Sequence, residues 1–282
     1  MRHAACGPSA SNSSDWGNVP GMHQGFDYKG KSVFVAGGTS GINLGIAEGF
    51  ARAGAKVGVI SRSPDKVAAA VETLKAHGGE AAGASVDVRK SDDLLAAIKE
   101  VHGGIGDFDV VVSGAAGNFP APALGMSTNG FKSVVDIDLL GTFNVLRHAF
   151  EFMTKPGCSV INVSAPQAWT PTPFQVHVCA AKAGVDMVTK VLAMEWGAMG
   201  VRVNSIAPGP IDDTEGMARL APSPEAKEHT RKSVPLQRFG TKDDIANAAL
   251  FLGSDLASYV TGAVMVVDGG WALGGSSAFM PG

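Results

Sequence analysis

Hydrophobic and polar positions along the chain alternate between two kinds of segment. Short runs rich in β-branched residues lie at 32–36, 56–61, 81–87, 109–114, 159–164, 202–207 and 263–268. Longer stretches with apolar residues at helical spacing lie between them, at 42–54, 64–77, 91–102, 127–153, 174–198 and 241–253. Strands that alternate with helices indicate βαβ units. The pattern therefore predicts an α/β fold, with a doubly wound, seven-stranded parallel sheet and helices on both faces.

The two ends of the chain and one internal segment depart from this alternation. Residues 1–28 are rich in Ser, Gly, Asn and Pro and show no periodicity, which predicts a flexible N-terminal arm. No change of composition divides residues 29–282, so we expect a single domain there. Segment 210–235, with DDTEG and several prolines, predicts an excursion over one face of the fold. Loops of that length often cover a binding site, so this segment is a candidate substrate loop.

Charge and targeting signals exclude several classes of protein. The chain has 23 Lys and Arg against 26 Asp and Glu, a net charge of −3, which argues against nucleic-acid or polybasic membrane partners. We find no apolar run of 18 residues and no secretory signal. The last four residues are Phe-Met-Pro-Gly, which is not an SKL-type peroxisomal address. The three cysteines, Cys6, Cys158 and Cys179, are too scattered for a disulfide framework or a metal site. These features predict a cytoplasmic protein without a metal.

A glycine-rich loop marks the first strand-to-helix crossover. Residues 36–47, AGGTSGINLGIA, follow the first strand and open the first helix. Glycines at this place let backbone N–H groups approach a pyrophosphate at the positive end of the helix. The alternative is a glycine-rich turn without a ligand, but a strand before and a helix after favour a dinucleotide site.

The end of the second strand indicates which dinucleotide is bound. Dinucleotide-binding folds that use NAD place an acidic residue there, about 20 residues after the loop, for the ribose 2′-hydroxyl. Here Ser61, Arg62 and Ser63 occupy this place. A guanidinium binds a 2′-phosphate that a carboxylate would repel, so NADP(H) is favoured. Lys66 would add a second charge, unless both cations lie on a solvated loop.

Residues 29–273 as a whole resemble the short-chain dehydrogenase/reductase family. The matching motifs are GGTSGI (37–42), DV (87–88), AAG (115–117), Lys182, PGPI (208–211) and VDGG (267–270). The resemblance implies a Rossmann fold, a homotetramer, pyrophosphate at the glycine loop, adenine at Asp87 and nicotinamide at PGPI. The expected cofactor contacts are Gly37, Thr39, Ser40, Gly41, Ile42, Arg62, Ser63, Asp87, Val88, Ala115, Gly117, Lys182, Pro208, Gly209 and Ile211. Asn43 replaces the family's third glycine; since Asn tolerates unusual backbone angles, we expect binding to survive.

The catalytic positions depart from the family's usual Asn, Ser and Tyr-x-x-x-Lys. Lys182 is present, but Val178 stands at the Tyr position, Ala165 at the Ser position and Asp138 at the Asn position. A positioned general acid typically contributes about 10²–10⁴-fold to the rate. Because both hydroxyl donors are lost, we expect ordinary carbonyl reduction to be slow.

Four other residues near these positions could replace the missing proton donors. His177 lies five residues before Lys182, about 140° around a regular helix, so it should point elsewhere. Ser164 should face the opposite side of its strand from Ala165. Cys179 has no His–Asp partner in the pattern, and Gln167 is uncharged and should line a pocket.

Asp138 is the informative substitution. A carboxylate near Lys182 can form a charged pair or relay a proton through water; the alternative is a surface aspartate without a role. This altered set resembles one branch of the family, the peroxisomal-type 2,4-dienoyl-CoA reductases. AAGNF (115–119), QVHVCAAKAGVD (175–186) and PLQRFG (235–240) are also similar to that branch.

The resemblance implies NADPH-dependent reduction of a 2,4-dienoyl-CoA to a 3-enoyl-CoA, in the β-oxidation of unsaturated fatty acids. The charge that develops spreads to the thioester oxygen and the product is protonated on carbon, so the reaction tolerates loss of Tyr if the oxyanion is stabilised. Lys182 would hold the nicotinamide ribose and supply positive potential, and Asp138 would orient Lys182 or a water. Asn118, Phe119 and Gln167 would border the acyl-CoA substrate.

Two other functions stay open at this point. One is a 3-oxoacyl or other carbonyl reductase with unusual proton delivery, which acetoacetyl-CoA would reveal as a substrate. The other is a catalytically weak NADPH-binding or scaffold subunit, which would bind NADPH without turning over any acyl-CoA.

Overall fold

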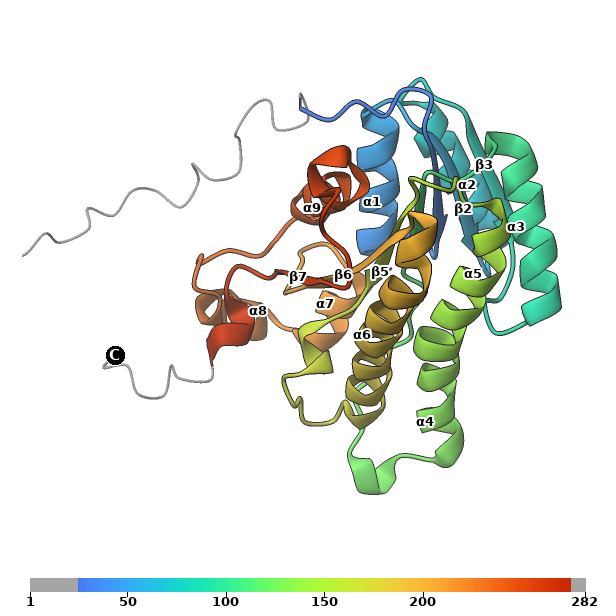
Figure 1. Ribbon diagram of the computed structural model, residues 1–282. Helices are drawn as coiled ribbons and strands as arrows, with labels where there is room; N and C mark the ends of the chain where they lie inside the picture. Colours follow the sequence, from blue (N-terminus) through green and yellow to red (C-terminus); the bar gives the residue numbers. More distant parts are fainter. Residues whose placement is uncertain (1–24, 275–282) are drawn as a thin grey trace, which may run out of the picture.

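The computed structural model describes residues 25–274 of the chain, shown in Figure 1. Its strands are β1 (Ser32–Ala36), β2 (Lys56–Ser61), β3 (Ala81–Ser85), β4 (Val110–Ser113), β5 (Ser159–Val163), β6 (Arg202–Pro208) and β7 (Val264–Val267). Its α-helices are α1 (Gly41–Arg52), α2 (Pro64–Lys75), α3 (Ser91–Ile105), α4 (Thr128–Val135), α5 (Gly141–Ala149), α6 (Val176–Trp196), α7 (Glu215–Leu220), α8 (Pro224–Ser233) and α9 (Lys242–Gly253).

The strands form one parallel sheet in the order β3-β2-β1-β4-β5-β6-β7. Helices cover both faces, because the strands are apolar on both sides: β1 and β4 are buried along their whole length. One core lies against α3, α5 and α6, and the other against α1, α2 and α9. The chain turns to opposite sides of the sheet after β1 and after β4, and ligands of such folds bind at that switch point, beyond the carboxyl ends of the strands. The predicted seven-stranded, doubly wound fold is confirmed.

Local signals account for where several helices begin. Ser63 caps α2 by accepting a hydrogen bond from the Lys66 N–H, and Pro64 opens the helix. Thr241 and Asp244 form a reciprocal capping box at the start of α9. These caps satisfy N–H groups that the first turn of a helix leaves without partners.

Three segments differ in detail from the sequence prediction. The helix predicted over 127–153 is interrupted by a π-helical turn at Asp136–Leu140, which separates α4 from α5. Segment 210–235 contains the short helices α7 and α8 rather than an extended loop. Strand β3 ends at Ser85, so Asp87 and Val88 lie in the loop that follows.

The start of the folded part also differs from expectation. Most of the arm predicted at 1–28 lies outside the described residues, but Tyr28 is 4% exposed and packs edge-on against Phe50. Its hydroxyl donates to the Leu250 carbonyl at 2.7 Å. Packing against the core therefore begins before residue 29. Among residues 25–274, each helix is too short or too polar to cross a bilayer.

Candidate active site

The glycine loop at the end of β1 leaves its backbone open to a cleft. Gly37 has φ +80°, and a Cβ there would lie 2.9 Å from Ala115, so a larger residue would not fit. Gly41, at the start of α1, has φ +56°, and a Cβ there would meet nothing within 4 Å. The loop borders a cleft of about 280 Å³, lined by Gly37, Thr39, Ser40, Arg62, Asp87, Val88 and Ala115 among others, whereas Gly41 lines the adjacent cleft described below. An open backbone at a helix start, with cations nearby, fits a dinucleotide.

Asn43 adapts the loop to the end of β4. Its side-chain amide donates to the Gly114 carbonyl at 2.6 Å, and a Cβ at Gly114 would lie 2.2 Å from the Asn43 Oδ1. The absence of a side chain at residue 114 therefore makes room for Asn43. This pairing of two distant positions explains how the loop keeps its shape without the family's third glycine.

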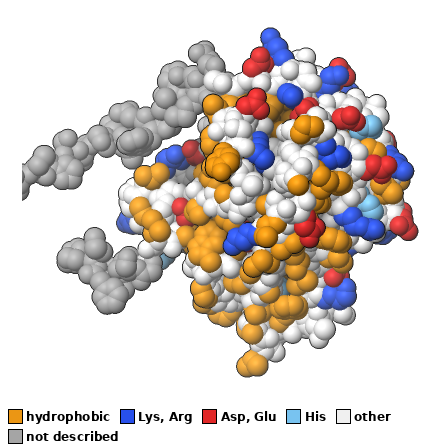
Figure 2. Space-filling view, viewed as in Figure 1, with side chains coloured by type: hydrophobic (Ala, Val, Ile, Leu, Met, Phe, Trp, Pro, Cys, Tyr) orange, Lys and Arg blue, Asp and Glu red, His pale blue; other side chains and the backbone are white. Residues whose placement is uncertain are grey.

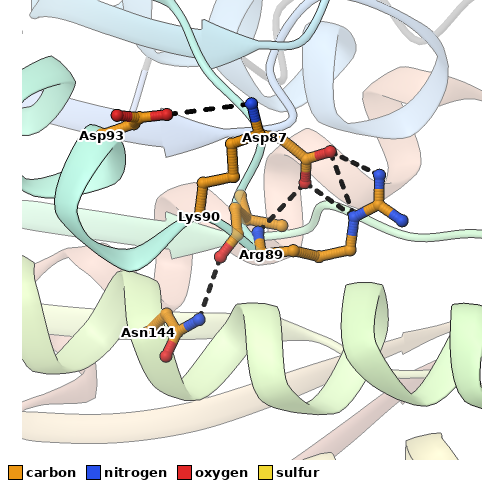
Figure 3. A network of polar contacts seen from close by, with 6 residues as sticks. Asp87, Arg89, Lys90, Asp93 and Asn144 are labelled. Atoms are coloured by element: carbon orange, nitrogen blue, oxygen red, sulfur yellow. Dashed lines mark hydrogen bonds and ion pairs between the residues drawn. The ribbon is translucent and has the colours of Figure 1, made fainter.

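Asp87, which lines this cleft, forms an ion pair with Arg89 (Figure 3). Arg89 Nε donates to the two carboxylate oxygens of Asp87 at 2.9 and 3.1 Å, and these hydrogen bonds lower the Asp87 pKa to about 2. Asp87 is therefore an ionised acceptor at neutral pH, suited to an exocyclic amino group. Arg62 and Lys66 also line this cleft, whereas Ser63 caps α2 and does not line it.

A buried ion pair forms the centre of a second cleft. Lys182 Nζ lies 3.2 Å from Asp138 Oδ2, with side chains 8% and 1% exposed, and donates to the Val163 carbonyl at 3.0 Å. The other carboxylate oxygen, Asp138 Oδ1, accepts the Gly117 N–H at 2.7 Å. Asp138 belongs to the π-helical turn, a form of helix that often occurs at functional sites. The interpretation of Asp138 as a surface residue is thereby excluded.

The second cleft, of about 370 Å³, is lined by most of the other predicted residues but not by Phe119. It is lined by Gly41, Ile42, Gly117, Asn118, Asp138, Gln167, Lys182, Pro208, Gly209 and Ile211, and also by Ala165 and Val178. Ser40 and Asn43 line both clefts, so the two are adjacent. A donor bound in the first cleft and an acceptor bound in the second would therefore meet beside Lys182.

Known proteins of similar sequence and fold identify the family of this chain. Residues 36–272 match the family model described as Enoyl-(Acyl carrier protein) reductase. A putative short-chain alcohol dehydrogenase from Sinorhizobium meliloti superposes with a TM-score of 0.83 at 30% identity, over 88% of this chain and 98% of that one. The chain belongs to the short-chain dehydrogenase/reductase family. It is therefore an oxidoreductase that uses a nicotinamide cofactor.

Two relatives within the family share most of the chain. A peroxisomal 2,4-dienoyl-CoA reductase of the (3E)-enoyl-CoA-producing kind from Arabidopsis thaliana is 42% identical over 86% of this chain and 84% of its own length. A probable 2,4-dienoyl-CoA reductase of the (2E)-enoyl-CoA-producing kind from Bacillus subtilis is 39% identical, over 85% of this chain and 96% of its own length.

Phe119 does not line either cleft of this short-chain dehydrogenase/reductase. Its ring packs on the buried ring of His177 with centroids 4.5 Å apart. Neither His177 ring nitrogen makes a hydrogen bond within residues 25–274, and burial lowers the His177 pKa, against smaller opposing effects of the Phe119 main chain and Asp138. His177 is therefore a neutral, buried side chain packed against Phe119, and it lines neither cleft.

Gln167 lies where the second cleft meets a more apolar one. Its amide donates to Gln175 Oε1 at 3.3 Å. It also lines a neighbouring cleft of about 670 Å³, whose other residues include Trp169, Pro171 and Phe174. The prediction that Gln167 lines a pocket is confirmed.

Two polar residues near Lys182 were not assigned to the site by sequence reasoning. Ser164 lines the second cleft together with Ala165, and its buried side chain interacts with Asp186. Strand β5 ends at Val163, and the alternation of a strand no longer holds after it. Asp186, one helical turn after Lys182, is 7% exposed. Burial raises its pKa, while Ser164, Ser205 and the charges of Lys190 and Lys182 oppose the shift. Its spacing of four residues from Lys182 was the available signal.

Proposed function

We propose that this short-chain dehydrogenase/reductase reduces 2,4-dienoyl thioesters of CoA with NADPH. The observation that carries the proposal is the buried Lys182–Asp138 pair, which stands where the family's usual sites have a lysine and an asparagine. Relatives from two kingdoms of life, at 42% and 39% identity, bear the name of this activity. Val178 and Ala165 leave their two positions without a hydroxyl donor, which suits a reaction that ends in protonation of carbon.

The residues of the second cleft divide the chemistry among them. When bound, the nicotinamide ring supplies the hydride. Lys182 is held between the Val163 carbonyl and the Asp138 carboxylate, so its positive charge has a fixed place beside the cleft. A fixed charge in a water-poor site stabilises the negative charge that develops on a conjugated thioester oxygen. Asp138 orients Lys182 and, through a water, directs the proton that carbon receives.

Cofactor choice rests on the residues after β2. Arg62 and Lys66 line the first cleft, and no acidic residue intervenes between Ser61 and Asp65. Two cations favour a 2′-phosphate over a hydroxyl. We expect NADPH to be a better reductant than NADH, and a clear preference for NADH in initial rates would refute this part of the proposal.

The position of the remaining double bond separates the two relatives. The Arabidopsis protein is named for a (3E)-enoyl product and the Bacillus protein for a (2E)-enoyl product. We propose the 3-enoyl-CoA, which forms when the dienolate is protonated at the carbon next to the thioester, because the relative with the higher identity, 42% against 39%, is named for that product. Proton NMR of the isolated product distinguishes the two.

The decisive experiment compares two thioesters. Purified protein is mixed with NADPH and either a short 2,4-dienoyl-CoA or acetoacetyl-CoA, and NADPH absorbance is followed. Oxidation with the dienoyl thioester alone supports the proposal. Oxidation with acetoacetyl-CoA alone would favour a carbonyl reductase, and NADPH binding without turnover of either would favour a non-catalytic subunit.

Assembly and location complete the proposal. Phe143 on α5 and Met187, Val191 and Met194 on α6 are exposed apolar side chains, and Figure 2 shows hydrophobic side chains gathered over this lower part of the molecule. We expect these faces to pair in a homotetramer, which light scattering during gel filtration tests; a monomer would refute it.

We also expect a cytoplasmic location, although the Arabidopsis relative is named peroxisomal, and imaging of a fluorescent fusion distinguishes the two.

A further inference from the structure

Two residues that line the first cleft form an ion pair. Lys66, in the first turn of α2, and Glu215, at the start of α7, both line this cleft, and Lys66 Nζ lies 3.7 Å from Glu215 Oε1. Glu215 also lines the second cleft. The chain thus places one of its own carboxylates beside Lys66, where the proposed function requires the 2′-phosphate of the cofactor.

Helix α7 links this carboxylate to the substrate side. Arg219 Nη2 donates to Glu215 Oε2 at 3.1 Å, and Arg219 Nη1 donates to the Asn118 carbonyl at 2.7 Å. Asn118 follows Gly117, whose N–H donates to Asp138. A chain of contacts therefore runs from Lys66 through α7 to the loop that bonds to Asp138.

We propose that Glu215 competes with the 2′-phosphate of the cofactor for Lys66, and that NADPH displaces Glu215 from Lys66 when it binds. A phosphate carries about −1.5 to −2 charges at neutral pH, against −1 for a carboxylate, so it competes effectively for the same ammonium. A cofactor without the 2′-phosphate has no group that can take Lys66 from Glu215. Binding of NADPH, but not of NADH, would then release the contact between α7 and Lys66, while Arg219 keeps its hydrogen bond to Asn118.

The pair is suited to displacement because it is weak. The Lys66 and Glu215 side chains are 56% and 67% exposed, and exposed pairs of this kind change a binding constant by at most about fivefold. A tightly held pair would block the cofactor, whereas this one imposes a small, removable competition. The inference rests on the proposed use of NADPH.

The first test is the Glu215→Gln variant. Glutamine keeps an acceptor for Arg219 and removes the charge that holds Lys66. We expect the dissociation constants of NADPH and of adenosine 2′,5′-bisphosphate to fall by about two- to fivefold, and that of NADH to change by less. Glu72→Gln is the matched control, because Glu72 pairs with Lys75 on the same helix at 3.1 Å and lines neither cleft. Weaker NADPH binding in Glu215→Gln, or equal tightening of NADH, would overturn the inference.

The second test follows α7 itself. Adenosine 2′,5′-bisphosphate carries the phosphate but no nicotinamide, so it should speed hydrogen exchange of the α7 amides in the wild type, and Glu215→Gln should show the faster exchange without it. Unchanged α7 exchange in both would contradict the release. If the wild type binds NADH as tightly as NADPH, the cofactor proposal fails and this inference with it. If the wild type discriminates but Glu215→Gln behaves like Glu72→Gln, this inference alone fails.

Discussion

Replacement of Asp138 by asparagine should lower both the stability and the activity of the protein. The two carboxylate oxygens of Asp138 face two donors: Oδ1 accepts the Gly117 N–H at 2.7 Å, and Oδ2 lies 3.2 Å from Lys182 Nζ. Asparagine has nearly the same shape but only one oxygen, and its NH₂ group is itself a donor. In Asp138→Asn one of the two donors must therefore face another donor, inside a site with side chains only 1% and 8% exposed.

The loss in the free energy of unfolding depends on which of the two donors loses its acceptor. A buried N–H left without an acceptor costs about 1–3 kcal/mol. A buried charge left without its counter-ion costs about 3–5 kcal/mol. Because the Val163 carbonyl still accepts from Lys182, we expect a loss of about 2–4 kcal/mol in the free energy of unfolding. For a domain of this size that lowers the melting temperature by roughly 5–15 °C.

Calorimetry and initial rates test this reasoning together. Asp136→Asn is the matched control: Asp136 lies in the same π-helical turn but pairs with Lys132 at the surface, so its loss should cost about 0.5 kcal/mol or less. Reduction of a 2,4-dienoyl-CoA should fall by at least about tenfold in Asp138→Asn and stay near wild type in the control. Wild-type melting and wild-type turnover in Asp138→Asn would show that the Lys182–Asp138 pair has neither role.

Three further predictions concern groups outside this pair. His177→Phe should raise the unfolding free energy by about 1–2 kcal/mol in denaturant titration, because two buried ring nitrogens lack hydrogen bonds within residues 25–274; destabilisation would show a hidden partner. Burial raises the Cys158 pKa, so a thiol reagent should label Cys179 and spare Cys158 in the native protein. Carboxyl NMR should find the Asp87 pKa near 2 and higher in Arg89→Ala; since the folded pKa is lowered, the stability it contributes should be lost as pH falls from about 4 to 2.

The parts of the fold that local pattern determines were predictable. Strand β1 occupies Ser32–Ala36 and β2 occupies Lys56–Ser61, as predicted, because apolar β-branched runs bounded by turn residues have few alternatives in a two-sided sheet. The meeting of Asp138 and Lys182 was also predictable, since both positions match motifs whose geometry is shared by the short-chain dehydrogenase/reductase family.

The parts that depend on contacts between distant residues were not predictable. The π-helical turn at Asp136–Leu140 leaves no break in hydrophobic spacing, so the sequence reads as one long helix. Arg219 donates a hydrogen bond to the Asn118 carbonyl, which is 101 residues away in the chain. Arg231 and Lys232, by contrast, pair with Glu228 on their own helix. Charged residues in a polar segment carry no local sign of their partner.

Close approach of helices explains why the reactive pair sits where it does. A Cβ at Gly184 would lie 2.7 Å from the Leu139 side chain, so the small residue on α6 lets the π-helical turn pack directly on that helix. Leu139 is the residue after Asp138, and Gly184 lies two residues after Lys182, so this contact lies beside the two charged side chains. Gly141 makes a similar contact, with a would-be Cβ 2.7 Å from Val88 in the loop after β3. Small residues on both sides of the π-helical turn therefore let it pack closely against its neighbours, and this packing places the Asp138 carboxylate within reach of Lys182.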